Sequence, residues 1–204
     1  MKRLVLEKAK EIIVENNNIN DIKLEEIMYG LEGLYLTIYK LIIILIIALI
    51  LNIFKEVIIF LLLFNVIRFF AFGVHAKNSI TCLISSSIIF ISLPLISKLL
   101  VFNSFIRIIV SALSFVLILR YSPADTEKKP IIAKKRRLFY KVCSVLVCTI
   151  FIVSSFIVRN NFLCNSLLLS IFTEALMICP FTYKIFGVSY NNYLAYNVNI
   201  KKGE

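Results

Sequence analysis

One histidine and one cysteine stand close together in this 204-residue chain. His75 is the only histidine, and Cys82 follows seven positions later in the stretch RFFAFGVHAKNSITC. Thiol catalysis needs a thiolate, and an adjacent imidazole can take the proton and hold the ion pair that results. The two residues are therefore candidates for the base and the nucleophile of a thiol enzyme.

The spacing limits how these two side chains can meet. On one continuous α-helix, residues seven positions apart lie about 10 Å apart along the axis, which exceeds a hydrogen bond of ~3 Å. The chain must therefore turn, and Gly73 and the polar run 77–79 are suitable positions. The alternative interpretation is that Cys82 is a small packing residue and His75 a solvated residue at the membrane surface.

Composition places the chain in a membrane. Sixty per cent of the residues are hydrophobic and the mean hydropathy is +0.90, whereas apolar residues make up about half of a soluble domain. The first residues, MKRLVLEKAKEIIVENNN, are too charged for a cleaved secretory signal. We expect an all-α integral membrane protein with about six transmembrane helices.

Six apolar segments approach the roughly 17–25 residues that a membrane span needs. They are 36–54, 57–74, 80–97, 101–119, 142–158 and 162–180. Before them, residues 1–35 have apolar positions at helical spacing, which predicts amphipathic surface helices. We expect three regions, namely this N-terminal region, a membrane domain over 36–188, and a C-terminal tail over 189–204.

Much of the net charge of +11 lies in the loop 120–141, which contains eight basic residues and only two acidic ones. Positive loops usually face the cytoplasm, so this loop, the Arg68–Cys82 stretch and both termini are expected on that side of the cell membrane. No recognition fold surrounds the basic cluster, so nucleic acid is not an expected partner. Attraction to anionic lipid headgroups or to an acidic peptide stays open.

The other cysteines suggest neither a disulfide framework nor a zinc site. An odd total, one histidine and no CxxC motif fit neither pattern. We expect small buried side chains at Cys143, Cys148, Cys164 and Cys179. No metal and no cofactor are expected.

Three stretches of the chain resemble one known family. Arg68, Gly73, His75, Ala76 and Cys82, in the order R-x4-G-x-H-A-x5-C, are similar to the signature of the AgrB (accessory gene regulator protein B) membrane peptidases of Gram-positive bacteria. MYGLEGLYL before the first span and RYSPADTEKKPI after the fourth agree, so the resemblance covers nearly the whole chain. It departs at one position, because Phe72 stands where family members usually have a second glycine.

The resemblance implies a cysteine endopeptidase that cuts the C-terminal part from an AgrD-like precursor peptide in quorum sensing. His75 would be the base and Cys82 the nucleophile. A thiol or hydroxyl of the precursor would then displace the enzyme thioester and close a thiolactone or lactone ring. Arg68 matches a family position and either holds an acidic group of the precursor or snorkels to the headgroups. The partners implied are the precursor and the bilayer, and a homodimer stays open.

A third catalytic residue is not assigned. Asp125 is the best-placed cytoplasmic carboxylate, although PAD also reads as a plain turn; Asn65 and Asn78 are alternatives. Lys134 and Lys135 are expected to help recruit an acidic segment of the precursor by electrostatic attraction.

One carboxylate lies well inside an apolar segment. Glu174 in segment 162–180 is expected to be paired or functional, with Arg107 as its candidate partner. The same two residues support a second hypothesis, a small multipass peptide transporter or exporter whose path they would line.

Overall fold

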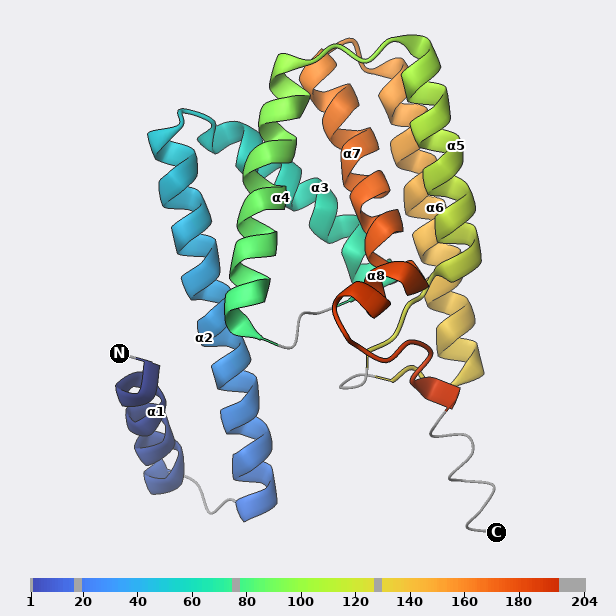
Figure 1. Ribbon diagram of the computed structural model, residues 1–204. Helices are drawn as coiled ribbons and strands as arrows, with labels where there is room; N and C mark the ends of the chain where they lie inside the picture. Colours follow the sequence, from blue (N-terminus) through green and yellow to red (C-terminus); the bar gives the residue numbers. More distant parts are fainter. Residues whose placement is uncertain (1, 17–19, 75–77, 127–129, 195–204) are drawn as a thin grey trace. The chain divides into compact units, whose positions relative to one another are not determined.

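Figure 1 shows the computed structural model, which describes residues 2–16, 20–74, 78–126 and 130–194. Within these ranges the regular structure is helical and no strand is present. The helices are α1 (Lys2–Asn16), α2 (Asp21–Ile50), α3 (Phe54–Ala71), α4 (Ser79–Leu99), α5 (Ser104–Tyr121), α6 (Lys134–Ile157), α7 (Asn161–Met177) and α8 (Pro180–Ile185). The all-α prediction is confirmed. His75 lies outside the described residues.

The chain divides into two compact units, Met1–Ile47 and Ala48–Glu204. The first unit holds α1 and most of α2. Residues predicted as a separate surface helix before the first span belong to α2, which continues through the apolar segment without a break. It ends at Ile50, and Asn52 follows with φ +56, a conformation that asparagine tolerates better than most residues.

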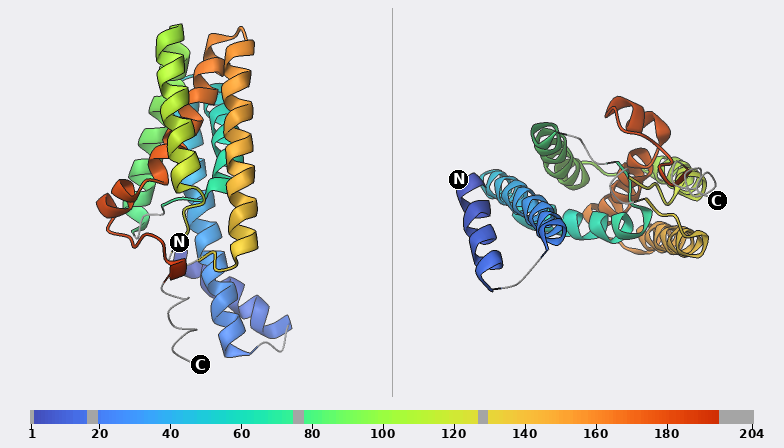
Figure 2. Two further views of the ribbon diagram at one scale, coloured as in Figure 1. Left: turned by 90° about the vertical axis from the view of Figure 1, so that its right-hand side faces the viewer. Right: turned by 90° about the horizontal axis from the view of Figure 1, so that it is seen from below.

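Helix α7 is the central element of the second unit. It contacts α3, α4, α5 and α6, and Figure 2 shows these four helices around it. Its side chains are buried on every face from Cys164 to Ala175, except that Phe172 is half-buried. A helix buried on all sides shows no apolar stripe. Small polar residues, Ser166, Ser170 and Thr173, allow neighbouring backbones to approach closely.

Polar side chains fix the helix ends at the Lys98 end of the bundle. Asn165 of α7 is buried, and its Nδ2 donates to the carbonyl oxygens of Ser97 at 3.2 Å and Leu100 at 2.6 Å. These two carbonyl groups at the end of α4 would otherwise lack intrahelical partners. Lys98 Nζ lies 2.7 Å from Glu56 Oε1 in the first turn of α3. The hydrogen bond from Lys98 holds the pKa of Glu56 below its usual value.

Four described helices, α2, α4, α5 and α6, are long and apolar enough to cross a membrane. Helix α7 has 17 residues and is shorter than these four. Helix α3 carries Lys55, Glu56 and Arg68 within its 18 residues. The chain is therefore a multi-pass membrane protein by helix length and composition, and the expectation of about six crossings stays a prediction.

Candidate active site

The end of α3 is a turn that needs unusual backbone angles. Phe72 has φ +62 and ψ −124, and Gly73 has φ +113. This φ of Gly73 is one that side chains rarely adopt, and an added Cβ would also lie 2.6 Å from Arg68 Nη1, so glycine is strongly favoured at this position. Helix α3 ends at Ala71 and α4 begins at Ser79. The expected bend near Gly73 is therefore present, and Val74 and Cys82 do not lie on one continuous helix.

Arg68 fixes this turn by reaching into the protein. Its Nη2 donates to the carbonyl oxygen of Val74 at 2.6 Å, and its Nη1 lies 3.2 Å from Glu174 Oε2 on α7. The Arg68 side chain is 16% exposed and that of Glu174 is 0% exposed. The guanidinium group is thus mostly buried, and it connects the backbone at Val74 to the central helix.

This pairing corrects one expectation. Glu174 is paired with Arg68, and Arg107 is not its partner. Arg107 instead donates from Nε to the Phe102 carbonyl at 3.0 Å and from Nη1 to the Ser155 carbonyl at 3.5 Å. The prediction failed because the sequence shows that Glu174 lies inside an apolar segment but does not show which basic side chain of another helix reaches it.

Glu174 uses only one of its two oxygens in the described part of the chain. Its Oε2 meets Arg68, whereas its buried Oε1 has no hydrogen-bond partner there. Oε1 lies 3.3 Å from the position that a Cβ on Gly73 would occupy. The carboxylate therefore borders the backbone turn that leads into the sequence motif.

The two motif stretches that resemble AgrB are joined by backbone hydrogen bonds. Gly73 N–H donates to the Ala124 carbonyl at 2.9 Å, and Ala124 N–H donates to the Ala71 carbonyl at 3.0 Å. Val74 N–H donates to the Met177 carbonyl at 3.2 Å at the end of α7. The turn at 72–74 is held between the SPAD stretch and α7, although these elements lie far apart in the sequence.

Asp125 anchors the segment that follows α8. It is 1% exposed, and its carboxylate accepts from the backbone N–H groups of Asn192 at 3.2 Å and Tyr193 at 2.9 Å. The Tyr183 hydroxyl donates to the carbonyl oxygens of Ala124 at 3.2 Å and Asp125 at 3.0 Å. Burial raises the pKa of Tyr183, so this hydroxyl remains neutral and able to donate at physiological pH.

Cys82 lies in the first turn of α4 and is half-buried. Its N–H donates to the Asn78 carbonyl at 3.0 Å, and its own carbonyl accepts from Ser85 Oγ at 3.3 Å. Asn78 precedes the helix and is exposed, and Asn65 Nδ2 donates to the Leu61 carbonyl within α3 at 2.7 Å.

The four remaining cysteines are small packing residues or helix-surface residues. Cys148 and Cys164 are buried, and Cys143 and Cys179 are half-buried. Cys164 Sγ donates to the Val158 carbonyl at 2.8 Å, and Cys179 Sγ donates to the Ala175 carbonyl at 3.1 Å. None of the five cysteines, all within the described ranges, takes part in a disulfide bond.

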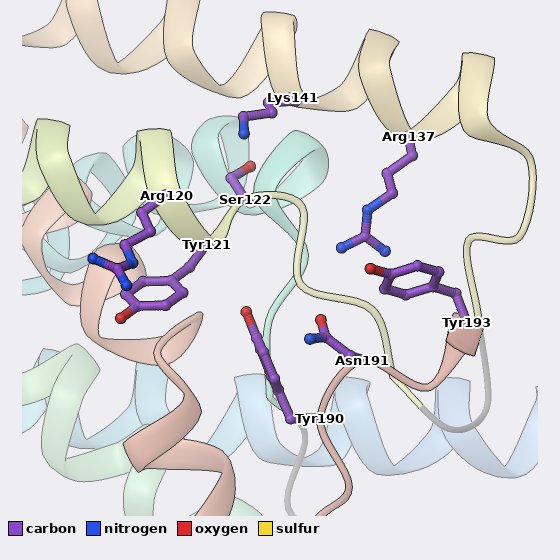
Figure 3. Close-up of a pocket in the computed structure, with 8 residues that line it drawn as sticks. All are labelled: Arg120, Tyr121, Ser122, Arg137, Lys141, Tyr190, Asn191 and Tyr193. Atoms are coloured by element: carbon purple, nitrogen blue, oxygen red, sulfur yellow. The ribbon is translucent and has the colours of Figure 1, made fainter. Parts of the chain in front are cut away.

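The basic residues of the 120–141 loop separate into two groups. Lys134 and Lys135 are exposed in the first turn of α6. By contrast, a cavity of about 320 Å³ is lined by Arg120, Tyr121, Ser122, Arg137, Lys141, Tyr190, Asn191 and Tyr193 (Figure 3). Sequence reasoning missed this cavity. The spacing of Arg137 and Lys141, four residues apart on one helical face, was the available signal.

Phe72 offers a test of the turn. We expect Phe72→Gly to be more stable than Phe72→Ala by about 1 kcal/mol, because alanine keeps the strained φ that glycine relieves. Both changes remove the same ring contact, in which the Phe72 and Tyr140 ring centroids are 4.8 Å apart. Thermal unfolding of the purified variants in detergent measures the difference.

The matched control for this test is Gly33→Ala, at an exposed position inside α2 with no atom within 4 Å of an added Cβ. There alanine should be the more stable residue, because glycine is disfavoured in a helix interior. A Phe72→Ala protein that melts at or above the temperature of Phe72→Gly would contradict the assigned backbone.

Comparisons with known proteins agree with the motifs. The family model described as Accessory gene regulator B matches residues 6–178. A Clostridium acetobutylicum protein named as AgrB-like is 32% identical over 205 residues, which cover 98% of each chain. Accessory gene regulator protein B of Staphylococcus aureus strain Newman is 39% identical over 130 residues, covering 63% of this chain and 69% of that one. The protein of the same name from strain MRSA252 is 35% identical over 136 residues, covering 65% and 73%.

No solved structure matches the chain. The family match covers well over half of the residues and includes Arg68, Gly73, Cys82, Ala124 and Glu174. The chain belongs to the accessory gene regulator B family of membrane proteins.

Proposed function

We propose that this protein is a membrane-embedded cysteine endopeptidase that cleaves the C-terminal part of an AgrD-like quorum-sensing precursor and promotes ring closure in the remaining peptide. The observation that carries the proposal is the contact between the two motif stretches, in which Gly73 N–H donates to the Ala124 carbonyl and Ala124 N–H donates to the Ala71 carbonyl, at the turn before His75. Membership of the accessory gene regulator B family supports the proposal separately.

The proposed chemistry begins at Cys82. His75 takes the thiol proton, the sulfur attacks the scissile carbonyl carbon, and the amide C–N bond breaks as the proton passes to the leaving amine. The acyl group then remains on Cys82 as a thioester. A thiol or hydroxyl within the precursor attacks this thioester, the bond to Cys82 breaks, and the released proton returns to the sulfur. The ring forms without a cofactor because the thioester keeps the acyl group activated.

The start of α4 supports a nucleophile at Cys82. The first N–H groups of a helix lack intrahelical acceptors, and the helix dipole is positive at this end. Such an environment stabilises negative charge that develops when the sulfur attacks a carbonyl. Water must be kept from the thioester, which a site at the membrane surface can do.

Arg68 is proposed as a positioning residue. Its contacts with Val74 and Glu174 face into the protein, which supports a role in holding the backbone before His75 in preference to binding the precursor directly. Lys134 and Lys135 are exposed and remain the proposed attractants for an acidic segment of the precursor. Asp125 is engaged by the backbone of Asn192 and Tyr193, which favours the turn role over a catalytic one.

We expect Cys82→Ala and His75→Ala each to abolish cleavage of the precursor while the protein still inserts into the membrane. An epitope-tagged precursor followed on gels in cells expressing each variant measures this. The combined change of Cys143, Cys148, Cys164 and Cys179 to alanine is the control and should keep substantial activity. Cleavage at the wild-type rate by either single variant would refute the assignment.

The site is proposed to face the cytoplasm, where a newly made precursor is available. Lys135→Cys and Asn161→Cys, both at exposed positions, would be introduced one at a time into a variant without native cysteines. A membrane-impermeant maleimide should label position 161 in intact cells and position 135 only after permeabilisation. Labelling of position 135 in intact cells would put the proposed site on the opposite side.

A further inference from the structure

The cavity in Figure 3 lies where three parts of the chain meet. Arg120 and Tyr121 come from the end of α5, and Arg137 and Lys141 come from the beginning of α6. Tyr190, Asn191 and Tyr193 come from the segment after α8. This segment is held in place because Asp125 accepts the N–H groups of Asn192 and Tyr193. The cavity is thus built by the fold and is not a gap between loosely placed loops.

The lining is cationic. Three basic side chains border the cavity and, among the described residues, no carboxylate does. Asp125 lies outside the lining, and its two oxygens accept from backbone N–H groups. Tyr190 adds a hydroxyl that stays neutral, because burial raises its pKa to about 12. The site offers donors and positive charge, and no acidic residue of the described ranges lines it.

The guanidinium group of Arg137 gives a second, independent reason to expect an anion in the cavity. Its guanidinium carbon lies 3.6 Å from the centre of the Tyr193 ring, which fixes the plane of the group. Its Nη1 atom is buried and has no hydrogen-bond partner within the described ranges. A buried charged donor without an acceptor is unfavourable. An anion in the cavity would complete the hydrogen bonding of this group.

The surroundings indicate an anion that carries hydrocarbon chains. The cavity lies at the ends of two helices that can span a membrane, Ser104–Tyr121 and Lys134–Ile157. Large apolar side chains that neighbour the lining residues in the sequence are exposed on these two helices, including Leu119, Leu138, Phe139 and Val142. Tyrosines are typical of the layer where lipid headgroups meet hydrocarbon. A soluble anion would use the basic groups but not the apolar surface next to them.

We propose that this cavity binds the phosphate of an anionic phospholipid, with Arg120, Arg137 and Lys141 as its ligands and the acyl chains along the exposed faces of α5 and α6. The bound headgroup would hold residues 190–193 against the loop between α5 and α6 that contains Asp125. This loop in turn joins the turn at Gly73 through Ala124. The inference does not depend on the proposed peptidase activity.

Thermal unfolding tests the proposal on the full-length protein purified in a neutral detergent. Phosphatidylglycerol should raise the melting temperature, and phosphatidylcholine should do so much less. We expect Arg137→Gln and Lys141→Gln each to raise the lipid concentration for half-maximal effect about tenfold, the loss typical of one hydrogen bond to a charged group. Arg136→Gln and Lys135→Gln remove equal charge from exposed neighbours outside the cavity and should change it by less than about twofold.

Three further comparisons distinguish a phospholipid from a small soluble phosphate, an acidic peptide and nonspecific charge attraction. Inorganic phosphate or glycerol phosphate that stabilises the protein as well as the lipid, at equal concentration, would overturn the lipid assignment. An acidic peptide that stabilises the wild type but not Arg137→Gln, while phosphatidylglycerol has no effect, would make the cavity a peptide site. Equal losses in all four variants would show nonspecific attraction and also overturn the proposal.

Native mass spectrometry provides a second readout that does not depend on melting. The wild type and both control variants should retain phosphatidylglycerol when stripped of detergent, and Arg137→Gln and Lys141→Gln should retain less. Equal lipid retention in all five proteins would refute the proposed site, whatever the melting temperatures of the variants.

Discussion

A buried ion pair between Arg68 and Glu174 is the constraint on which the candidate site depends. Glu174 lies in the central helix with its side chain fully buried, 3.2 Å from the guanidinium group. Removing one partner of such a pair generally costs about 3–5 kcal/mol, because the other charge is left buried and uncompensated. Arg68 also donates to the Val74 carbonyl. The charge balance of the central helix is therefore coupled to the backbone conformation of the turn before His75.

That turn is linked by hydrogen bonds to the other segments at the same end of the bundle. Gly73 N–H donates to the Ala124 carbonyl, Ala124 N–H donates to the Ala71 carbonyl, and the Asp125 carboxylate accepts from the backbone of Asn192 and Tyr193. Each step uses backbone N–H and carbonyl groups that would otherwise be buried without partners. The result is a continuous path of contacts from α7 through the motif turn to the segment that closes the cationic cavity. Cys82 lies in the first turn of the next helix, α4.

The sequence predicted features that depend on local composition or spacing. Apolar runs found α3 to α7, whereas the charged residues before residue 36 concealed that the surface helix expected there continues into the first apolar segment as α2. Gly73 was expected at a bend and lies in one. The partner of Glu174 was predicted wrongly, because contacts between helices are set by packing and not by position along the chain. The cavity was missed for the same reason, since Tyr190 and Tyr193 meet Arg137 only after folding.

The cleavage kinetics of Glu174→Gln test the central claim most directly. Purified protein in liposomes would be compared with Glu56→Gln, which removes the same charge from the pair with Lys98 at the other end of α3. Both would be assayed at a temperature where melting curves show them folded. If Arg68 and Glu174 position His75, Glu174→Gln should lower kcat at least about tenfold with little change in KM, as misplaced catalytic groups do, whereas Glu56→Gln should keep the wild-type kcat. A wild-type kcat for Glu174→Gln would contradict the account.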